Sequence, residues 1–258
     1  MKQGILLAAF GSSGRQNESV LQLFDAEVRA RFPGLAVRWA FTSLLMRERL
    51  AMERKKTDSV RKALEKMAFE RYSHVAVQPL QCIPGQEYGD VLEETLALSR
   101  ERDIVVRVGT PLLHSDEDVA AAAAALLRHL PAEREEHEAV VWVGHGTRHP
   151  ATARYEALAH TVRLRDPLVY VGTMYDAPAL PRILEELRER RSRHVWLLPL
   201  LAVVGRHALR DLAGPEELSW KSRIEAAGIA CTPVLKGSAE YAGFIQIWLD
   251  HLEQALRA

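Results

Sequence analysis

The sequence predicts an α/β protein of two similar lobes, each built on a four-stranded parallel sheet flanked by helices. Short apolar runs alternate with helical patterns along all 258 residues, which is typical of a parallel sheet wrapped by helices. Several runs, such as residues 140–143 and 195–200, are apolar throughout, as expected for strands buried on both faces. The strand patterns of the first half recur in the same order in the second half, which indicates an internal duplication.

The individual elements follow from this alternation. Strands are expected at residues 4–10, 35–42, 74–80, 104–109, 139–144, 168–173, 194–200 and 229–235. Helices are expected at residues 17–31, 57–70, 89–102, 116–129, 151–163, 179–193, 215–227 and 239–257. The stretch 115–137, Ala-rich and then Glu-rich, carries the helix and the connection between the lobes. We therefore expect a first lobe at residues 1–130 and a second at residues 131–258.

The duplication assigns counterparts to four side chains. Residues 4–12 match residues 139–147, so that Phe10 corresponds to His145. Residues 78–80 with 85–87 match residues 198–200 with 205–207, so that Glu87 corresponds to His207. A looser match relates residues 38–42 to residues 169–173. All four side chains follow strands at their carboxyl ends, where open α/β sheets bind ligands.

Composition excludes several classes of protein. The 34 basic and 34 acidic residues balance, so the chain lacks the basic excess of proteins that bind nucleic acid or anionic membranes. No apolar run approaches the length of a membrane span, and the first residues enter a strand without a signal-peptide pattern. Cys82 and Cys231 lack the CxxC spacing of zinc or redox sites and are interpreted as reduced, packed thiols. We expect a cytoplasmic protein.

His145 and His207 are the candidate metal ligands. His145 lies in Gly144-His145-Gly146-Thr147 directly after an apolar strand, and the glycines permit a tight turn. His207 follows Gly205-Arg206, in a loop or at the start of a helix. Two neutral imidazoles suit a divalent transition metal. The alternative is structural: either histidine, taken alone, is compatible with a hydrogen-bonded turn or a surface helix end.

Glu87 has two interpretations as well. An acid in Gly85-Gln86-Glu87-Tyr88 is common at the start of a helix, where the dipole stabilises it. Its match to His207 favours a place in the functional site. The chain has no GxGxxG, Walker, Gly-x-Ser-x-Gly or HExxH motif, so the common nucleotide, hydrolase and zinc-protease functions lack their residues.

In these motifs the chain resembles the class II tetrapyrrole chelatases, and among them the sirohydrochlorin cobaltochelatases of the oxygen-independent route to cobalamin. The resemblance covers essentially the whole chain. It rests on the strand and turn at residues 6–13, on residues 40–43, 85–88, 109–113, 143–146 and 219–221, and on Pro199-Leu200 followed by residues 205–207. Each motif is weak alone, but their order and spacing together are specific.

The resemblance implies two α/β lobes with a tetrapyrrole held in the cleft between them, and a metal bound by two histidines and a glutamate. His145 and His207 match the histidine positions. The family pattern Val-Gly-x-Val-Glu reads Val171-Gly172-Thr173-Met174-Tyr175 here, so Tyr175 stands where the family has glutamate and Asp176 follows it. The third ligand is then Asp176, the Tyr175 oxygen, Glu87 or water. Gln81 is a second departure, because some relatives carry histidine there.

The expected activity is insertion of Co²⁺ into sirohydrochlorin or a related tetrapyrrole, with no tightly bound cofactor and with Fe²⁺ or Ni²⁺ as further metals. A base has to remove two pyrrole N–H protons, and neutral histidine suits this near pH 7. Each side chain then has an expected role: His145 as base and ligand, His207 as second ligand, Glu87 as the acid that orients substrate or relays protons, Phe10 as an apolar wall, and Ser12, Ser13 and Thr147 as carboxylate-binding groups.

Two other functions stay open: a ferrochelatase that makes sirohaem or haem, and a non-catalytic carrier of tetrapyrrole or metal. The carrier is favoured by one feature, the missing glutamate at Tyr175. A periplasmic-type binding protein is disfavoured because no signal peptide is recognised. The sequence leaves the oligomeric state open, a homo-oligomer included.

Overall fold

The chain divides into two compact units. The computed structural model describes residues 2–11, 14–175 and 179–257, and at residues 15, 16, 206 and 207 it describes the backbone alone. Unit 1 comprises Met1–His114 and Ile245–Ala258, and unit 2 comprises Ser115–Phe244. Each unit contains a four-stranded parallel sheet flanked by helices, so the predicted fold class is confirmed.

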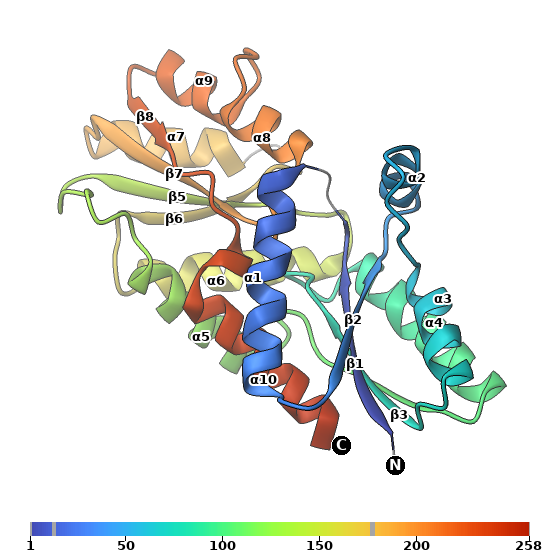
Figure 1. Ribbon diagram of the computed structural model, residues 1–258. Helices are drawn as coiled ribbons and strands as arrows, with labels where there is room; N and C mark the ends of the chain where they lie inside the picture. Colours follow the sequence, from blue (N-terminus) through green and yellow to red (C-terminus); the bar gives the residue numbers. More distant parts are fainter. Residues whose placement is uncertain (1, 12–13, 176–178, 258) are drawn as a thin grey trace. The chain divides into compact units, whose positions relative to one another are not determined.

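The sheet of unit 1 has the strand order β2-β1-β3-β4. Its strands are β1 (Gln3–Ala9), β2 (Ala36–Phe41), β3 (His74–Pro79) and β4 (Val105–Val108). Central strand β1 is buried from its second residue onward because helices cover both of its faces. Helices α3 (Val60–Phe69) and α4 (Gln86–Glu101) cover one face, and α1 (Arg15–Arg31) and α10 (Ala242–Arg257) cover the other (Figure 1).

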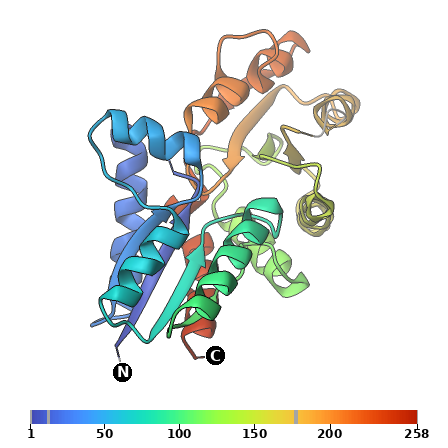
Figure 2. The same ribbon diagram turned by 90° about the vertical axis from the view of Figure 1, so that its right-hand side faces the viewer.

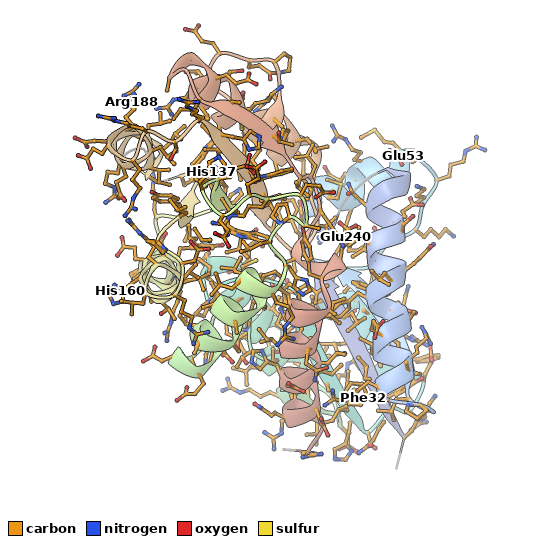
Figure 3. The ribbon with its side chains drawn as sticks, turned by 90° about the vertical axis from the view of Figure 1, so that its left-hand side faces the viewer. Phe32, Glu53, His137, His160, Arg188 and Glu240 are labelled. Carbon is orange, nitrogen blue, oxygen red and sulfur yellow. The ribbon has the colours of Figure 1, made fainter. Side chains whose placement is uncertain are left out.

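The sheet of unit 2 has the equivalent order β6-β5-β7-β8. Its strands are β5 (Ala139–Gly144), β6 (Val169–Thr173), β7 (His194–Leu200) and β8 (Ala230–Pro233). Helices α7 (Ala179–Glu189), α8 (Arg206–Ala213) and α9 (Trp220–Ala226) pack with one face, while Trp142 on the other face contacts Tyr241 and Phe244. Helices α5 (Asp116–Arg128) and α6 (Ala153–Arg163) complete the unit, with short 3₁₀ turns at Pro150–Thr152 and Ser238–Glu240. Figure 3 shows Arg188 on α7 and His160 on α6.

The duplication that the sequence predicts is present in the strand order and the register. Ala8 pairs with Pro79 in unit 1, and Val143 pairs with Pro199 in unit 2, as the repeat requires. One match shifts by a residue: Ala9 pairs with Phe41 and Gly144 with Thr173, so Phe41 rather than Thr42 is the counterpart of Thr173. The loose similarity of these two strands did not determine their register.

The units divide at residues 114/115 and 244/245, whereas the sequence predicted 130/131. Helix α5 packs with α6 of unit 2, and α10 returns to unit 1 after its first turn. There Trp248 packs edge-on against Phe24 at 6.0 Å between ring centroids, and the buried His251 forms a 3.0 Å hydrogen bond with the Thr110 carbonyl. The amphipathic pattern of α10 predicted a helix but not the sheet that it covers.

Each predicted strand is present within two residues of its expected ends, but the helices agree less well. Helix α2 (Leu44–Met52) was not predicted, because its large apolar side chains Leu44, Leu45 and Met52 are exposed and form no buried stripe. Its first turn is instead capped by Ser43, whose hydroxyl accepts the Met46 N–H at 3.3 Å. Figures 1 and 2 show α2 beyond the end of the first sheet.

Two further predictions concern the thiols and the membrane. Within the described residues neither Cys82 nor Cys231 is in a disulfide, and burial raises the pKa of Cys231 to about 12, as expected for packed thiols. In the described part of the chain, no helix combines the length and the apolar character of a bilayer-spanning segment.

Candidate functional site

His145 follows the carboxyl end of β5, and the turn after it depends on glycine. Gly146 has φ +74°, a conformation that side chains with a Cβ rarely adopt. A Cβ at Gly146 would also lie only 2.7 Å from the Thr173 Cβ of the neighbouring strand. The close approach of the β5 turn to the end of β6 therefore requires glycine at this position.

The imidazole of His145 is exposed, and one of its nitrogens is engaged. Its Nδ1 lies 3.0 Å from the Gly146 carbonyl oxygen. Because a carbonyl can only accept, Nδ1 carries the proton of the neutral ring, and Nε2 keeps its lone pair. Nε2 is thus the atom that can bind a metal or accept a proton. An exposed nitrogen whose partner ring atom is tied to the backbone is the arrangement found in many metal-binding histidines.

Tyr175 is the neighbour of His145. The Tyr175 N–H donates to the His145 carbonyl at 3.1 Å, and the Met174 N–H donates to the Gly144 carbonyl at 3.0 Å. The two rings lie 4.9 Å apart between centroids and are tilted by 41°. The structure therefore brings together His145 and Tyr175, the residue at the family's glutamate position.

Thr147 lies two residues after His145, at the approach to the 3₁₀ turn that precedes α6. Its hydroxyl oxygen accepts the His149 N–H at 3.1 Å, and the His149 ring accepts the Ala151 N–H at 3.1 Å. This bond occupies an acceptor site of the hydroxyl and not its donor, because a hydroxyl has one donor and two acceptor sites. Thr147 can therefore still bind an anionic group.

Phe10 has the equivalent position in unit 1. It follows β1, its side chain is 52% exposed, and its carbonyl accepts the Ser43 N–H at 3.2 Å. Gly11 has φ +97°, as Gly146 has φ +74° in unit 2. The backbone arrangement of this turn is thus repeated, with Phe10 in place of His145 and Ser43 in place of Tyr175.

Glu87 and Phe10 line one cavity of about 260 Å³ in unit 1. Glu87 is the second residue of α4, after the N-cap Gly85, where the helix dipole favours a carboxylate. The other lining residues come from the end of β2, the start of α2 and the two helices α3 and α4: Thr42, Ser43, Arg47, Ser59, Val60, Asp90, Val91 and Glu94. The structure therefore brings the two predicted unit 1 residues to one site.

Sequence reasoning missed several of these lining residues. Glu87, Asp90 and Glu94 recur at helical spacing, a signal that was available once α4 was known to begin at Gln86. Arg47 is one of the missed residues: its guanidinium donates to the Phe41 carbonyl and, at 2.9 Å, to the Thr42 carbonyl. Those bonds depend on the position of α2, which the sequence did not predict.

The remaining predicted residues are described in part or not at all. His207 is the second residue of α8, after the N-cap Gly205. Glu87 has the same position in α4, which confirms the two residues as counterparts. The side chain of His207 lies outside the described part. Ser12, Ser13 and Asp176 lie outside the described residues.

Two features bear on the departures from the family pattern. Among the described residues, no group of three or more His, Cys, Asp or Glu side chains is placed to hold a metal ion. The side-chain nitrogen and oxygen of Gln81 are buried and, within the described part of the chain, have no hydrogen-bond partner. At the first departure, His145 has the aromatic ring of Tyr175 as its neighbour, where the family pattern predicts a carboxylate.

Comparisons with known proteins agree with the motifs. The family model "Cobalt chelatase (CbiK)" matches residues 3–257. The sirohydrochlorin cobaltochelatase CbiKC of Nitratidesulfovibrio vulgaris is 59% identical over 258 residues, covering 100% of this chain and 92% of that protein. The sirohydrochlorin cobaltochelatase of Salmonella typhimurium is 33% identical over 258 residues, covering 99% of this chain and 97% of that protein.

A solved structure shows the same fold at low sequence identity. SirB from Bacillus subtilis with Fe³⁺ superimposes with a TM-score of 0.69 at 17% identity, covering 99% of this chain and 96% of that chain. The fold and the resemblance inferred from the sequence are both confirmed. With a family model that spans nearly the entire chain and two relatives above 30% identity, this protein belongs to the cobalt chelatase (CbiK) family.

Proposed function

We propose that this protein inserts Co²⁺ into sirohydrochlorin. The observation that carries the proposal is its 59% identity, over its full length, to a sirohydrochlorin cobaltochelatase. The 33% identity to a second one supports the same substrate. The free Nε2 of His145, at the carboxyl end of a central strand, supplies a group suited to this chemistry.

The reaction exchanges two protons for one metal ion. Co²⁺ enters the macrocycle as two pyrrole nitrogens lose their protons, so the ring's electron pairs form the new metal–nitrogen bonds. His145 Nε2 has one lone pair, which cannot hold a metal and a proton together. We infer that it first binds Co²⁺ and, once the metal has passed to the ring, accepts one of the released protons.

His207 is the proposed second metal ligand. Imidazole ligands suit Co²⁺, and a small donor set leaves coordination positions for the incoming pyrrole nitrogens. Water can complete the coordination of the waiting ion. The same few donors would also accept Fe²⁺ or Ni²⁺, so metal selectivity is expected to be limited.

The unit 1 residues have proposed roles toward the organic substrate. Phe10 offers an exposed aromatic surface to the macrocycle. Glu87 would orient the substrate or relay the second proton, and Ser12, Ser13 and Thr147 would bind peripheral carboxylates. No tightly bound cofactor is part of this mechanism.

The test is anaerobic insertion of Co²⁺ and, separately, Fe²⁺ into sirohydrochlorin, followed by absorbance. We expect many turnovers per protein molecule, with Co²⁺ faster than Fe²⁺. A preference for Fe²⁺ would indicate a ferrochelatase. Stoichiometric binding without turnover would contradict the proposal and indicate a carrier of tetrapyrrole or metal.

A further inference from the structure

We propose that Tyr175 is a positioning residue whose ring holds the His145 imidazole in its metal-accepting orientation, and that its hydroxyl is not a metal ligand. The inference rests on the proposed function, because it takes Nε2 of His145 as the atom that receives Co²⁺. It assigns to this chain a different use of the position at which the family pattern has glutamate.

A backbone hydrogen bond fixes the position from which the Tyr175 side chain projects. Its N–H donates to the His145 carbonyl at 3.1 Å, which joins the turn after β6 to the segment that follows β5. A Cβ at Gly146 would lie 3.2 Å from the Tyr175 Cβ, so the turn and the tyrosine are already close. The ring therefore starts from a backbone position that this hydrogen bond ties to the His145 segment, although the side chain is 65% exposed.

The imidazole needs such a support. His145 is exposed, and a side chain with freely exchanging rotamers loses entropy whenever it is held in one of them. The hydrogen bond from Nδ1 to the Gly146 carbonyl restrains one edge of the ring. Contact with the Tyr175 ring, 4.9 Å away and tilted by 41°, restrains its face. Neither of these two contacts uses Nε2.

The Tyr175 hydroxyl is poorly suited to bind the metal, whereas the Tyr175 ring is well suited to contact the imidazole. A phenol oxygen is a poor ligand while it carries its proton, and it would add a third proton to an exchange that already involves two. A tightly held phenolate would also slow the transfer of an ion that has to leave. Ring contact has neither cost.

The duplicated turn in unit 1 supports this assignment. There the residue after the strand is Phe10, which has no ligand atom to orient, and the counterpart of Tyr175 is Ser43. Ser43 caps α2 through its hydroxyl and carries no ring. The aromatic side chain is thus found at the turn that carries the histidine.

The test compares Tyr175→Phe, which keeps the ring, with Tyr175→Ala, which removes it; Leu164→Ala, at another exposed apolar residue of unit 2, is the control. Two quantities are measured for each protein: Co²⁺ affinity without tetrapyrrole, by the visible absorption of bound Co²⁺, and kcat and KM for insertion. We expect Tyr175→Phe to match the wild type, and Tyr175→Ala to lose about two- to tenfold in kcat and Co²⁺ affinity with little change in KM for sirohydrochlorin.

Two results would overturn the inference. Equal losses in Tyr175→Phe and Tyr175→Ala would make the hydroxyl the functional group, and wild-type values in both would leave the ring without a role. If the wild type binds Co²⁺ but inserts none, the proposed function fails, while the Co²⁺ affinities of the variants still decide the role of Tyr175.

Discussion

The two units build the same turn and place different side chains on it. At the end of β1, the Thr42 and Ser43 N–H groups donate to the two carbonyls before Gly11, at 2.8 and 3.2 Å. At the end of β5, Met174 and Tyr175 make the same pair of bonds at 3.0 and 3.1 Å. The backbone is therefore a common frame, and the chemistry depends on whether it carries Phe10 or His145.

The helix starts differ in the same way. Glu87 and His207 are each the second residue of a helix that begins after a glycine N-cap. In unit 1 this position carries a carboxylate and in unit 2 an imidazole. We infer that, after duplication, unit 2 specialised in nitrogen ligands for the metal and unit 1 in an aromatic and acidic surface for the organic substrate.

The largest expected difference is between the two residues that follow the central strands. His145→Ala should lower Co²⁺ insertion by about 10²- to 10⁴-fold, the usual contribution of a general acid–base group. Phe10→Ala should mainly raise KM for sirohydrochlorin, by about tenfold, since it removes apolar contact area. Both side chains are exposed, so the melting temperature should change little. Steady-state kinetics with thermal unfolding would check this, and equal kcat losses in the two variants would break the comparison.

Glu87 should have a smaller effect than His145. Glu87→Gln keeps the shape of the side chain and removes its charge, so we expect kcat to fall by about 10²-fold if the carboxylate relays a proton. Asp90→Asn, on the next turn of the same cavity wall, is the matched control. Insertion rates measured across a pH series would distinguish a relay from a purely structural acid. A rate equal to that of Asp90→Asn would show that Glu87 acts only as a first-turn helix acid.

Gly146 and Gly11 are equivalent turn residues whose substitution should affect stability and activity differently. Alanine at Gly146 or Gly11 must adopt a positive φ, which costs about 1–3 kcal/mol of stability in either unit. Only Gly146→Ala also displaces the carbonyl that holds His145 Nδ1, so it should reduce insertion more than Gly11→Ala does. Urea unfolding and insertion rates, measured side by side, give the two quantities. Similar activities for the two variants would show that the His145 turn needs no exact geometry.

A smaller effect, on the stability of the fold, is expected at His129, which caps the end of α5 and contacts the start of α10. The Gly243 N–H donates to its Nε2 at 3.1 Å, and burial, with Lys236 and Arg128 nearby, lowers the pKa of His129. As pH falls, His129 is therefore protonated in the unfolded chain before it is protonated in the folded protein. The contribution of His129 to the free energy of unfolding is full above about pH 6.5 and declines below it. His129→Gln should flatten that decline, because its amide oxygen can accept the same N–H.

Urea unfolding between about pH 7 and pH 5 would measure this effect. The control is His137→Gln (Figure 3), because the His137 side chain is 72% exposed. An identical pH dependence in wild type and His129→Gln would show that His129 does not contribute to the acid sensitivity of the fold.

Much of the fold could be predicted from the sequence because buried parallel strands have a simple pattern, a continuous apolar run. Strand β5 and residues 195–200 of β7 are apolar without interruption, and each strand was located within two residues. Helix α2 has no such pattern, since its stability depends on the Ser43 cap and on its place beside β2 rather than on a buried stripe. The return of α10 to unit 1 depends on tertiary contacts such as Trp248 with Phe24, which no local pattern encodes.

The candidate site was predictable to the extent that the duplication was. Matching the strand ends paired Phe10 with His145 and Glu87 with His207, and the helix and turn positions agree. The ring contact of Tyr175 with His145 could not be predicted, because it requires the register of β5 with β6 and the rotamers of both side chains. The bond from Nδ1 to Gly146, which leaves Nε2 free, likewise depends on the turn's conformation.

In the proposed function, Nε2 of His145 receives the metal. Its most direct test is a titration of Co²⁺ into the tetrapyrrole-free wild type and into His145→Ala, followed by the visible spectrum of the bound ion. We expect a saturable Co²⁺ spectrum in the wild type that is lost or strongly weakened in His145→Ala. Identical spectra and affinities in the two proteins would contradict it, and would place the metal on residues other than this strand end.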